Sequence, residues 1–188
     1  MFFKIDRLEN PESILREKIS GILGMPIDTY RKILIILVLL GEKKASDLTF
    51  PDSIDGARVK TILQNLRKIG LQADVIRTDT KRRNMAIGVS QSKAIIEELK
   101  ILNPDKDHRR FGELMGFPGS AVDAFTGENG AEKATAEAQF AAIKDLPRPR
   151  DFPYFAFSKN GMSLELEKVK RWVNLIREYA PELLEQPK

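Results

Sequence analysis

The spacing of apolar residues over the first forty positions predicts two helices. Asn10, Pro11 and Glu12 form a helix start, because Asn is a favoured N-cap and Pro and an acid are favoured in the first turn. Pro26 opens the next helix, which continues through the apolar run 33–40. Because apolar side chains cover every side of that run, we expect a fully buried central helix, with a buried strand as the alternative.

Between residues 45 and 103 the pattern changes from helical to alternating. Asp55 is placed to cap a helix that Gly70 ends in the left-handed conformation. Apolar and polar residues then alternate in two stretches separated by a polar segment, which is typical of a β-hairpin. In order, we expect a short helical turn over 45–48, a loop over 49–54, a helix over 56–69, strands over 73–78 and 85–90, and a helix up to Asn103.

Helical spacing returns in the second half of the chain. Three prolines between 146 and 153 exclude regular structure there. Ser120 is expected to cap a short helix that ends at Phe125. The other expected elements are helices over 107–115, 132–143 and 163–179 and a strand over 154–158.

These elements predict an α+β fold that is mainly helical and contains a small antiparallel β-hairpin or sheet. We expect two units, a helical and hairpin unit over 1–103 and a helical unit over 104–188 packed on it. No cysteine is present, which excludes disulfides and zinc–thiolate sites, and we expect no cofactor. The longest apolar run has about eight residues, far fewer than the ~20 of a membrane span. The early charges exclude a secretory signal, so a cytoplasmic location without membrane contact is expected.

The order of elements over 34–90 resembles that of a winged helix: a buried helix, a turn, an amphipathic helix and a two-stranded hairpin. In that family the second long helix enters the DNA major groove and the hairpin, or wing, touches phosphate. The resemblance therefore implies that the helix over 56–69 and the hairpin tip over 79–84 contact nucleic acid.

The charge pattern points to the same surface. The net charge is +4, which favours polyanionic partners, and no acid lies between Arg58 and Lys68. Lys and Arg neutralise phosphates, and Asn and Gln read base edges. The leading hypothesis is a non-enzymatic module that binds DNA or RNA, provided that the helix and the hairpin tip share one water-facing surface. The candidate residues are Arg58, Thr61, Asn65 and Lys68 on the helix and Arg77, Lys81, Arg82 and Arg83 on the hairpin.

Two alternatives stay open for this region. Basic helix faces and polar hairpin tips are often merely solvated, so the protein can equally be an interaction or assembly component with a protein partner. A split β-α-β fold needs no nucleic acid at all. That layout would use a strand over 48–50, a helix over 56–69, strands over 72–78 and 84–90, a helix over 93–102 and a last strand over 154–158.

A third hypothesis, an enzyme or small-ligand binder, concerns the segment that follows residue 104. Arg109 and Arg110 lie near a helix start, where an anion can bind. His108 is the only histidine, so no multi-histidine metal site is possible. Glu165 and Glu167 are two positions apart, which puts them on different helix faces and argues against a carboxylate pair.

Residues 110–125 carry a Gly116-Phe117-Pro118 turn before a short helix that ends in Phe125. This stretch is similar to one in a family of uncharacterised prokaryotic proteins. Members of that family often carry cysteines just after the proline, where this chain has Ser120 and Ala121. The resemblance implies no known function, and the missing thiols argue against a thiol or metal role.

Overall fold

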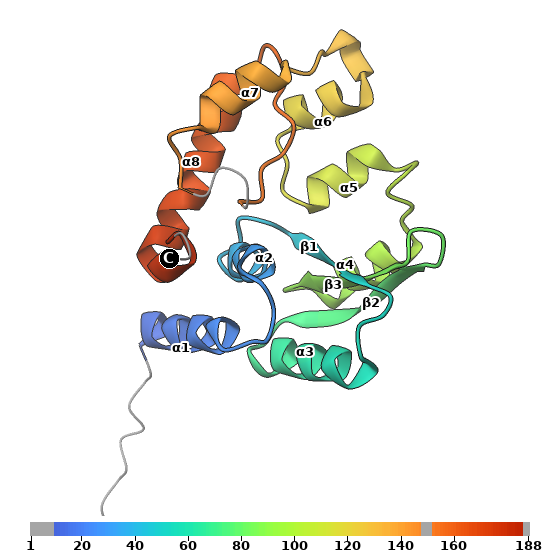
Figure 1. Ribbon diagram of the computed structural model, residues 1–188, viewed down its shortest axis with the longest axis vertical. Coiled ribbons are helices and arrows are strands. Elements are labelled where there is room, and N and C mark those ends of the chain that lie inside the picture. Colours follow the sequence, from blue (N-terminus) through green and yellow to red (C-terminus); the bar gives the residue numbers. More distant parts are fainter. Residues whose placement is uncertain (1–9, 148–151, 186–188) are drawn as a thin grey trace, which may run out of the picture.

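The computed structural model describes residues 10–147 and 152–185. Over these ranges it contains eight α-helices and a three-stranded antiparallel sheet, which confirms the α+β prediction (Figure 1). None of the helices in the described ranges combines the length and apolar character that a bilayer-crossing segment needs. The cytoplasmic location stays a prediction.

Helices α1 (Pro11–Leu23) and α2 (Thr29–Leu39) confirm the reading of the first forty residues. The Asn10 side chain accepts a hydrogen bond from the Glu12 amide at 3.1 Å and so caps α1. Helix α2 buries every residue from 33 to 38, as its apolar pattern predicted. Its start lies later than Pro26, because Asp28 is the N-cap and accepts from the Arg31 amide at 2.9 Å.

Strand β1 (Ala45–Pro51) corrects the prediction of a helical turn over 45–48 and a loop beyond it. The strand pairs antiparallel with β3 along its whole length. Leu48 and Phe50 point into the core and are buried, and Pro51 is the last strand residue. A segment of this length has no clear periodicity of its own, and its hydrogen-bond partners lie about forty residues later.

The sheet order β1-β3-β2 creates a split β-α-β unit. Helix α3 (Gly56–Lys68) connects β1 to β2 (Gln72–Asp79), and β3 (Asn84–Ser90) lies between the two strands and is antiparallel to both. Strands β1 and β2 are therefore parallel to each other, as in the alternative layout. The structure describes all of residues 52–71, and this stretch contains one helix, α3. The two helices of a helix-turn-helix are therefore not both present between β1 and β2.

Helices cover both faces of the sheet. Helices α2 and α3 pack on the face that carries Leu48 and Ile87, and α4 (Lys93–Ile101) packs on the opposite face against β2 and β3 (Figure 1). Gly88 leaves room for this packing, since a Cβ there would lie 3.3 Å from Leu99 Cδ1 of α4 and 2.6 Å from Ile76 Cγ2 of the neighbouring strand β2.

The second half forms a helical layer that joins the same core. Trp172 and Val173 of α8 (Met162–Tyr179) lie in one hydrophobic cluster with Ile35 and Leu37 of α2. The chain reaches α8 through three short helices and a coil (Figure 1). These are α5 (His108–Leu114), α6 (Gly119–Thr126) and α7 (Ala136–Ile143), with 3-10 turns η1 (Glu128–Gly130) before α7 and η2 (Pro181–Leu183) after α8.

Three predictions for this half are wrong. The expected strand over 154–158 is coil with a single isolated bridge from Ser158 to Lys133. Ser120 does not cap α6, because the N-cap is Pro118 and the Ser120 hydroxyl donates to Glu165 instead. Helix α7 starts later than 132, at Ala136, since the Thr135 side chain caps it.

Candidate functional site

Of the four predicted nucleic-acid residues of α3, Asn65 and Lys68 lie beside α1, and none of the four lies directly opposite the buried stripe. Successive residues of an α-helix are rotated by about 100°, which places Arg58 and Asn65 at the edge of the stripe that Ile62 centres. Arg58 Nη2 donates to the Pro26 carbonyl oxygen at 2.6 Å, and Thr61 Oγ1 donates to its own helix. Asn65 and Lys68 line a groove against α1. The residues directly opposite the stripe are Lys60, Gln64 and Arg67, all exposed.

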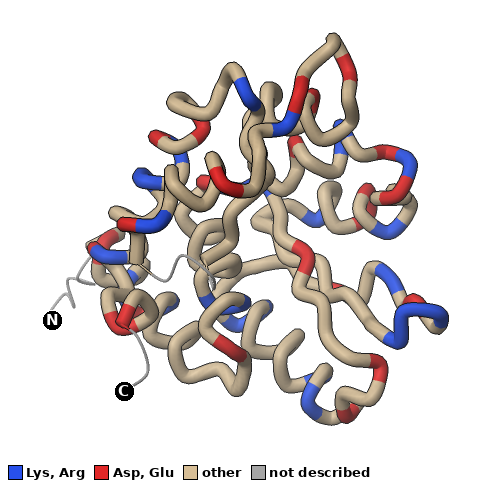
Figure 2. The backbone as a smooth tube through the Cα atoms, turned by 45° about the horizontal axis from the view of Figure 1, so that its top comes forward, with Lys and Arg blue, Asp and Glu red and all other residues tan. Residues whose placement is uncertain are grey.

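Three of the four candidate cations of the hairpin are paired with carboxylates. Arg77 donates to Asp47 Oδ2 at 2.7 Å across the sheet. The Arg82 guanidinium lies 3.7 Å from Asp79 and 3.6 Å from Asp105, and that of Arg83 lies 3.5 Å from Asp52. In Figure 2 the basic and acidic positions at this end of the molecule accordingly lie close together.

Lys81 is the tip cation for which the described residues provide no ion pair. Hydrogen bonds from the Arg82 and Lys81 amides, the former making the larger contribution, lower the pKa of Asp79, so this carboxylate is charged at neutral pH. The carboxylates of Asp52, Asp79 and Asp105 therefore balance the charges of Lys81, Arg82 and Arg83 at the tip. The positive electrostatic field of the tip is much weaker than the sequence pattern suggested.

The tip and the far end of α3 are at opposite ends of the sheet. Asn84 at the tip pairs with Pro51, immediately before α3, whereas Lys68 at the end of α3 is followed by the start of β2. Thirteen residues of helix span about 20 Å. The convergence of all eight candidate residues on one surface stays a prediction.

Arg109 and Arg110 are also occupied by carboxylates. Arg109 pairs with Asp123 and Glu128, and Arg110 Nε lies 2.5 Å from Glu98 Oε1. These hydrogen bonds raise the pKa of both guanidinium groups. An anion would have to displace these partners, so the anion site expected near this helix start has little support.

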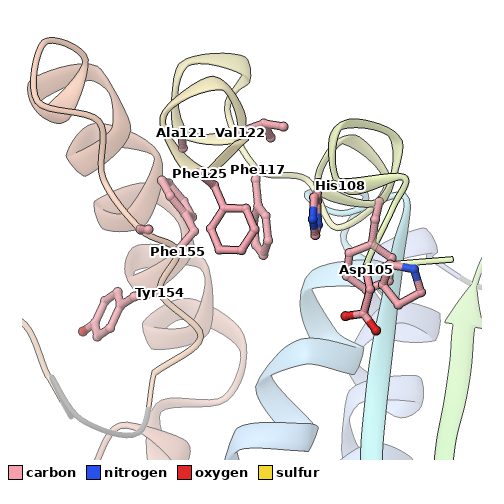
Figure 3. Close-up of a pocket in the computed structure, with 12 residues that line it drawn as sticks. Asp105, His108, Phe117, Ala121, Val122, Phe125, Tyr154 and Phe155 are labelled. Atoms are coloured by element: carbon pink, nitrogen blue, oxygen red, sulfur yellow. The ribbon is translucent and has the colours of Figure 1, made fainter. Parts of the chain in front are cut away.

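A cavity with mainly apolar walls lies between α5, α6 and the coil over 154–156. We call it the aromatic cavity; its volume is about 320 Å³. Figure 3 shows Asp105 and His108 on one side, Tyr154 and Phe155 on the other, and Phe117 and Phe125 between them. The rings of His108 and Phe125 pack edge to face with centroids 5.4 Å apart.

A second, smaller cavity adjoins the first and brings polar groups to it. We call it the lysine chamber; its volume is about 180 Å³, and it shares Phe111, Phe117 and Tyr154 with the aromatic cavity. Its remaining walls come from α2, from β1, from the segment between them, and from Met115 and Pro153. The polar residues in its lining are Tyr30, Lys43, Ser46, Asp47, Thr49 and Tyr154.

Lys43 is the unusual member of this set. It is only 3% exposed, and its Nζ donates to the Met115 carbonyl oxygen at 2.5 Å. The ring centroids of Trp172 and Phe117 lie 4.6 Å and 4.9 Å from Nζ. No described carboxylate forms an ion pair with it. Burial, with a smaller contribution from the nearby charge of Lys168, lowers the pKa of Lys43 to about 7.

Gly116 allows the turn between α5 and α6 to lie against Lys43. Its φ is +75°, and a Cβ there would lie 2.9 Å from the Glu42 carbonyl oxygen and 3.2 Å from Lys43 Cγ. The Gly-aromatic-Pro turn that stood out in the sequence therefore covers the Lys43 side chain, and Met115, immediately before the turn, provides the hydrogen-bond acceptor of the amine.

Two buried hydroxyl groups of the chamber make no hydrogen bond with the described residues. These are Ser46 Oγ, in a residue with 0% exposure, and Tyr154 OH. Burial raises the pKa of Tyr154 to about 12, so its phenol keeps its proton and stays a donor at neutral pH. Buried polar groups in proteins are almost always hydrogen-bonded, and an unmade bond costs roughly 1–3 kcal/mol. Two such groups in one chamber therefore suggest a binding site.

Glu165 holds the outer wall of this region in place. Its carboxylate is fully buried and accepts from Ser120 Oγ and Ser158 Oγ, both at 2.6 Å, and from the Ser158 amide at 2.7 Å. These bonds tie the start of α6 to α8. Glu167 is exposed, so the predicted absence of a carboxylate pair is consistent with the structure. The described residues contain no cluster of three or more potential metal ligands.

Comparison with protein-family models, with curated proteins and with solved structures finds no match to this chain.

Proposed function

We propose that the protein binds a small organic molecule in the aromatic cavity and the lysine chamber. The observation that carries this proposal is that the lining of one chamber, which adjoins an apolar cavity, contains the buried Lys43 together with Ser46 and Tyr154, whose buried hydroxyls are unbonded. Small-molecule sites have this composition: mostly apolar and aromatic walls with a few polar groups that orient the ligand. This is the class of the third hypothesis, at a site next to the turn over 116–120.

The dimensions suit a ligand with one aromatic ring and a short polar chain. The aromatic cavity, at about 320 Å³, is at the lower end of the usual range for ligand sites. At roughly 0.3–0.6 kcal/mol per non-hydrogen atom, a fragment of about eleven atoms would bind with a dissociation constant on the order of 10 μM to several mM. NMR detects binding in this range.

The test is an NMR titration of the isotope-labelled protein with single-ring aromatic fragments, performed also on a variant whose cavity is filled. Ala156 lines the aromatic cavity and is half-buried, so Ala156→Phe should occupy part of it. Ala141 is exposed on α7, and Ala141→Phe is the matched control. We expect fragments to shift the resonances of cavity residues in the wild type and in the control but not in Ala156→Phe. Absence of binding at millimolar concentrations, or binding that Ala156→Phe leaves unchanged, would refute the proposal.

Nucleic-acid binding is retained as a second candidate because of one feature of α3. The helix contains no acid, and Lys60 and Lys68 are exposed and form no ion pair with the described residues. We expect any binding to duplex or single-stranded oligonucleotides to fall steeply with salt. Lys60→Ala with Lys68→Ala should weaken it, whereas the exposed Lys144→Ala should not. No binding at low salt would rule this candidate out.

A further inference from the structure

We infer that the natural ligand is a monocarboxylic acid with an aromatic ring, whose carboxylate is bound by Lys43, Ser46 and Tyr154 in the lysine chamber. This inference rests on the proposed function of the cavity and adds the chemical class of the ligand.

The polar groups of the chamber are mainly donors that need an acceptor. A protonated lysine has three N–H bonds, and Lys43 uses one of them on Met115. The hydroxyls of Ser46 and Tyr154 each offer one more donor. A carboxylate has two oxygens with about four acceptor positions, so it can bind all three side chains at once. An alcohol or a single carbonyl would leave part of this set unbonded.

The charge of the chamber matches a single negative charge. Lys43 is the one cationic side chain in its lining. Asp47, the one acid there, already binds Arg77 at 2.7 Å and Thr49 Oγ1 at 2.9 Å. Lys43 could balance only one of the two negative charges of a dianion such as phosphate, and the other charge would be repelled by Asp47. A ligand amine would be repelled by Lys43. Hydrogen bonds between ionised partners are roughly twice as strong as neutral ones, which favours the carboxylate over a neutral isostere.

The remainder of the ligand is expected to be apolar and flat. The rings of Phe117 and Phe155 lie with centroids 5.5 Å apart, and His108 and Phe125 complete an aromatic lining. Such a lining stacks well on a ring, and its one carboxylate, Asp105, would repel a second negative charge on the ligand. An arylalkanoic acid therefore fits both cavities.

Binding should weaken at alkaline pH, because only protonated Lys43 can form the charge-assisted bond. The free amine has a pKa of about 7, and a bound carboxylate should raise it. Other titratable or charged groups also surround the amine. They are Lys168 and Arg171 on α8, Glu42 next to Lys43 in the chain, Tyr30 on α2, Asp47 on β1 and Tyr154 on the opposite wall.

The experiment compares three ligands with one skeleton: 3-phenylpropanoate, 3-phenylpropan-1-ol and 3-phenylpropan-1-amine. At pH 6 we expect the acid to bind roughly 10- to 100-fold more tightly than the alcohol, and the amine to bind most weakly. Affinity for the acid should fall up to tenfold per pH unit above pH 7, and affinity for the alcohol should not change.

Variants identify the groups that bind the carboxylate. Lys43→Met keeps the buried stem and should reduce acid binding to the level of the alcohol at every pH. Ser46→Ala and Tyr154→Phe remove one hydroxyl each and should weaken acid binding roughly 3- to 10-fold. Lys170→Met on the exposed side of α8 is the matched control and should behave like wild type.

The possible results distinguish a failure of the carboxylate inference from a failure of the proposed ligand-binding function. Equal binding of acid and alcohol, or tightest binding of the amine, would overturn the carboxylate inference and leave the cavity as a ligand site. Acid binding that survives Lys43→Met would also overturn it. If neither these ligands nor other aromatic fragments bind, the proposed function itself fails.

Discussion

Replacing Lys43 with Met should abolish a pH dependence of stability that the buried amine creates. In the folded protein the pKa of Lys43 is about 7, below the value of 10.5 for an exposed lysine. Between these two values the unfolded chain carries a proton that the folded protein lacks. Stability must therefore rise with pH across this window, and it should be lowest below pH 7, where folding buries a charged amine.

The size of the effect follows from the difference in proton binding. Each pH unit in which one proton separates the two states is worth about 1.4 kcal/mol. Because Lys43 is only half deprotonated at pH 7, the gain from pH 7 to pH 9 is about 2 kcal/mol. Met preserves the packing against Trp172 but loses the hydrogen bond to Met115, at a cost of about 1 kcal/mol. The free energy of unfolding of the variant should then be nearly independent of pH.

Urea denaturation at pH 6, 7, 8 and 9 measures this directly, with the fluorescence of Trp172, the only tryptophan, as the signal. Burial raises the pKa of Tyr30 and Tyr154, and such groups destabilise the fold only above about pH 10, outside this range. The neighbouring Lys44 is exposed, and Lys44→Met should keep the wild-type slope. A flat wild-type profile, or an equal slope in Lys43→Met, would refute the reasoning.

Three further predictions concern the supports of the site and its surroundings. Gly116→Ala should lower the free energy of unfolding in urea by about 1–3 kcal/mol, because φ at this position is positive and a Cβ would contact the backbone. Gly119 has open space around its Cα, so Gly119→Ala should change stability little, and equal effects of the two substitutions would contradict this. Glu165→Gln should cost about 1–3 kcal/mol, because one carboxylate oxygen is replaced by an NH2 group that cannot accept the hydrogen bonds of Ser120 and Ser158. A comparable loss in the exposed Glu167→Gln would disprove that explanation. Arg83→Ala should shift the melting temperature by less than about 3 °C, since its pair with an aspartate is exposed, and a larger loss would show that the tip is structurally important.

Local patterns predicted most of the elements, and they failed where the decisive partner was distant in the chain. The absence of a turn signal after Pro26 correctly favoured a helix for α2 over a buried strand, although the helix starts at Thr29. The sequence of β1 resembles a loop with a helical turn, because its pairing with β3 is not visible locally. The alternating pattern of β2 and β3 needed no such information, since the two strands are neighbours in the chain.

The candidate site was missed for the same reason. Lys43 stands in a polar stretch beside Gly41 and Lys44, which is typical of an exposed turn. Its burial comes from Met115, 72 residues later, and from the ring of Trp172. The charges of the hairpin tip were visible in the sequence, but their partners Asp52 and Asp105 were not identifiable as neighbours. The sequence signal that did point here was the Gly116-Phe117-Pro118 turn, which covers the amine.

The most direct test of the ligand site is an NMR titration of the Lys43 side chain, with and without 3-phenylpropanoate. The resonance of the carbon next to Nζ reports the protonation of this amine. The account predicts a pKa of about 7 in the free protein and a clear rise when the acid is bound. A pKa close to 10.5 that the acid leaves unchanged would contradict it.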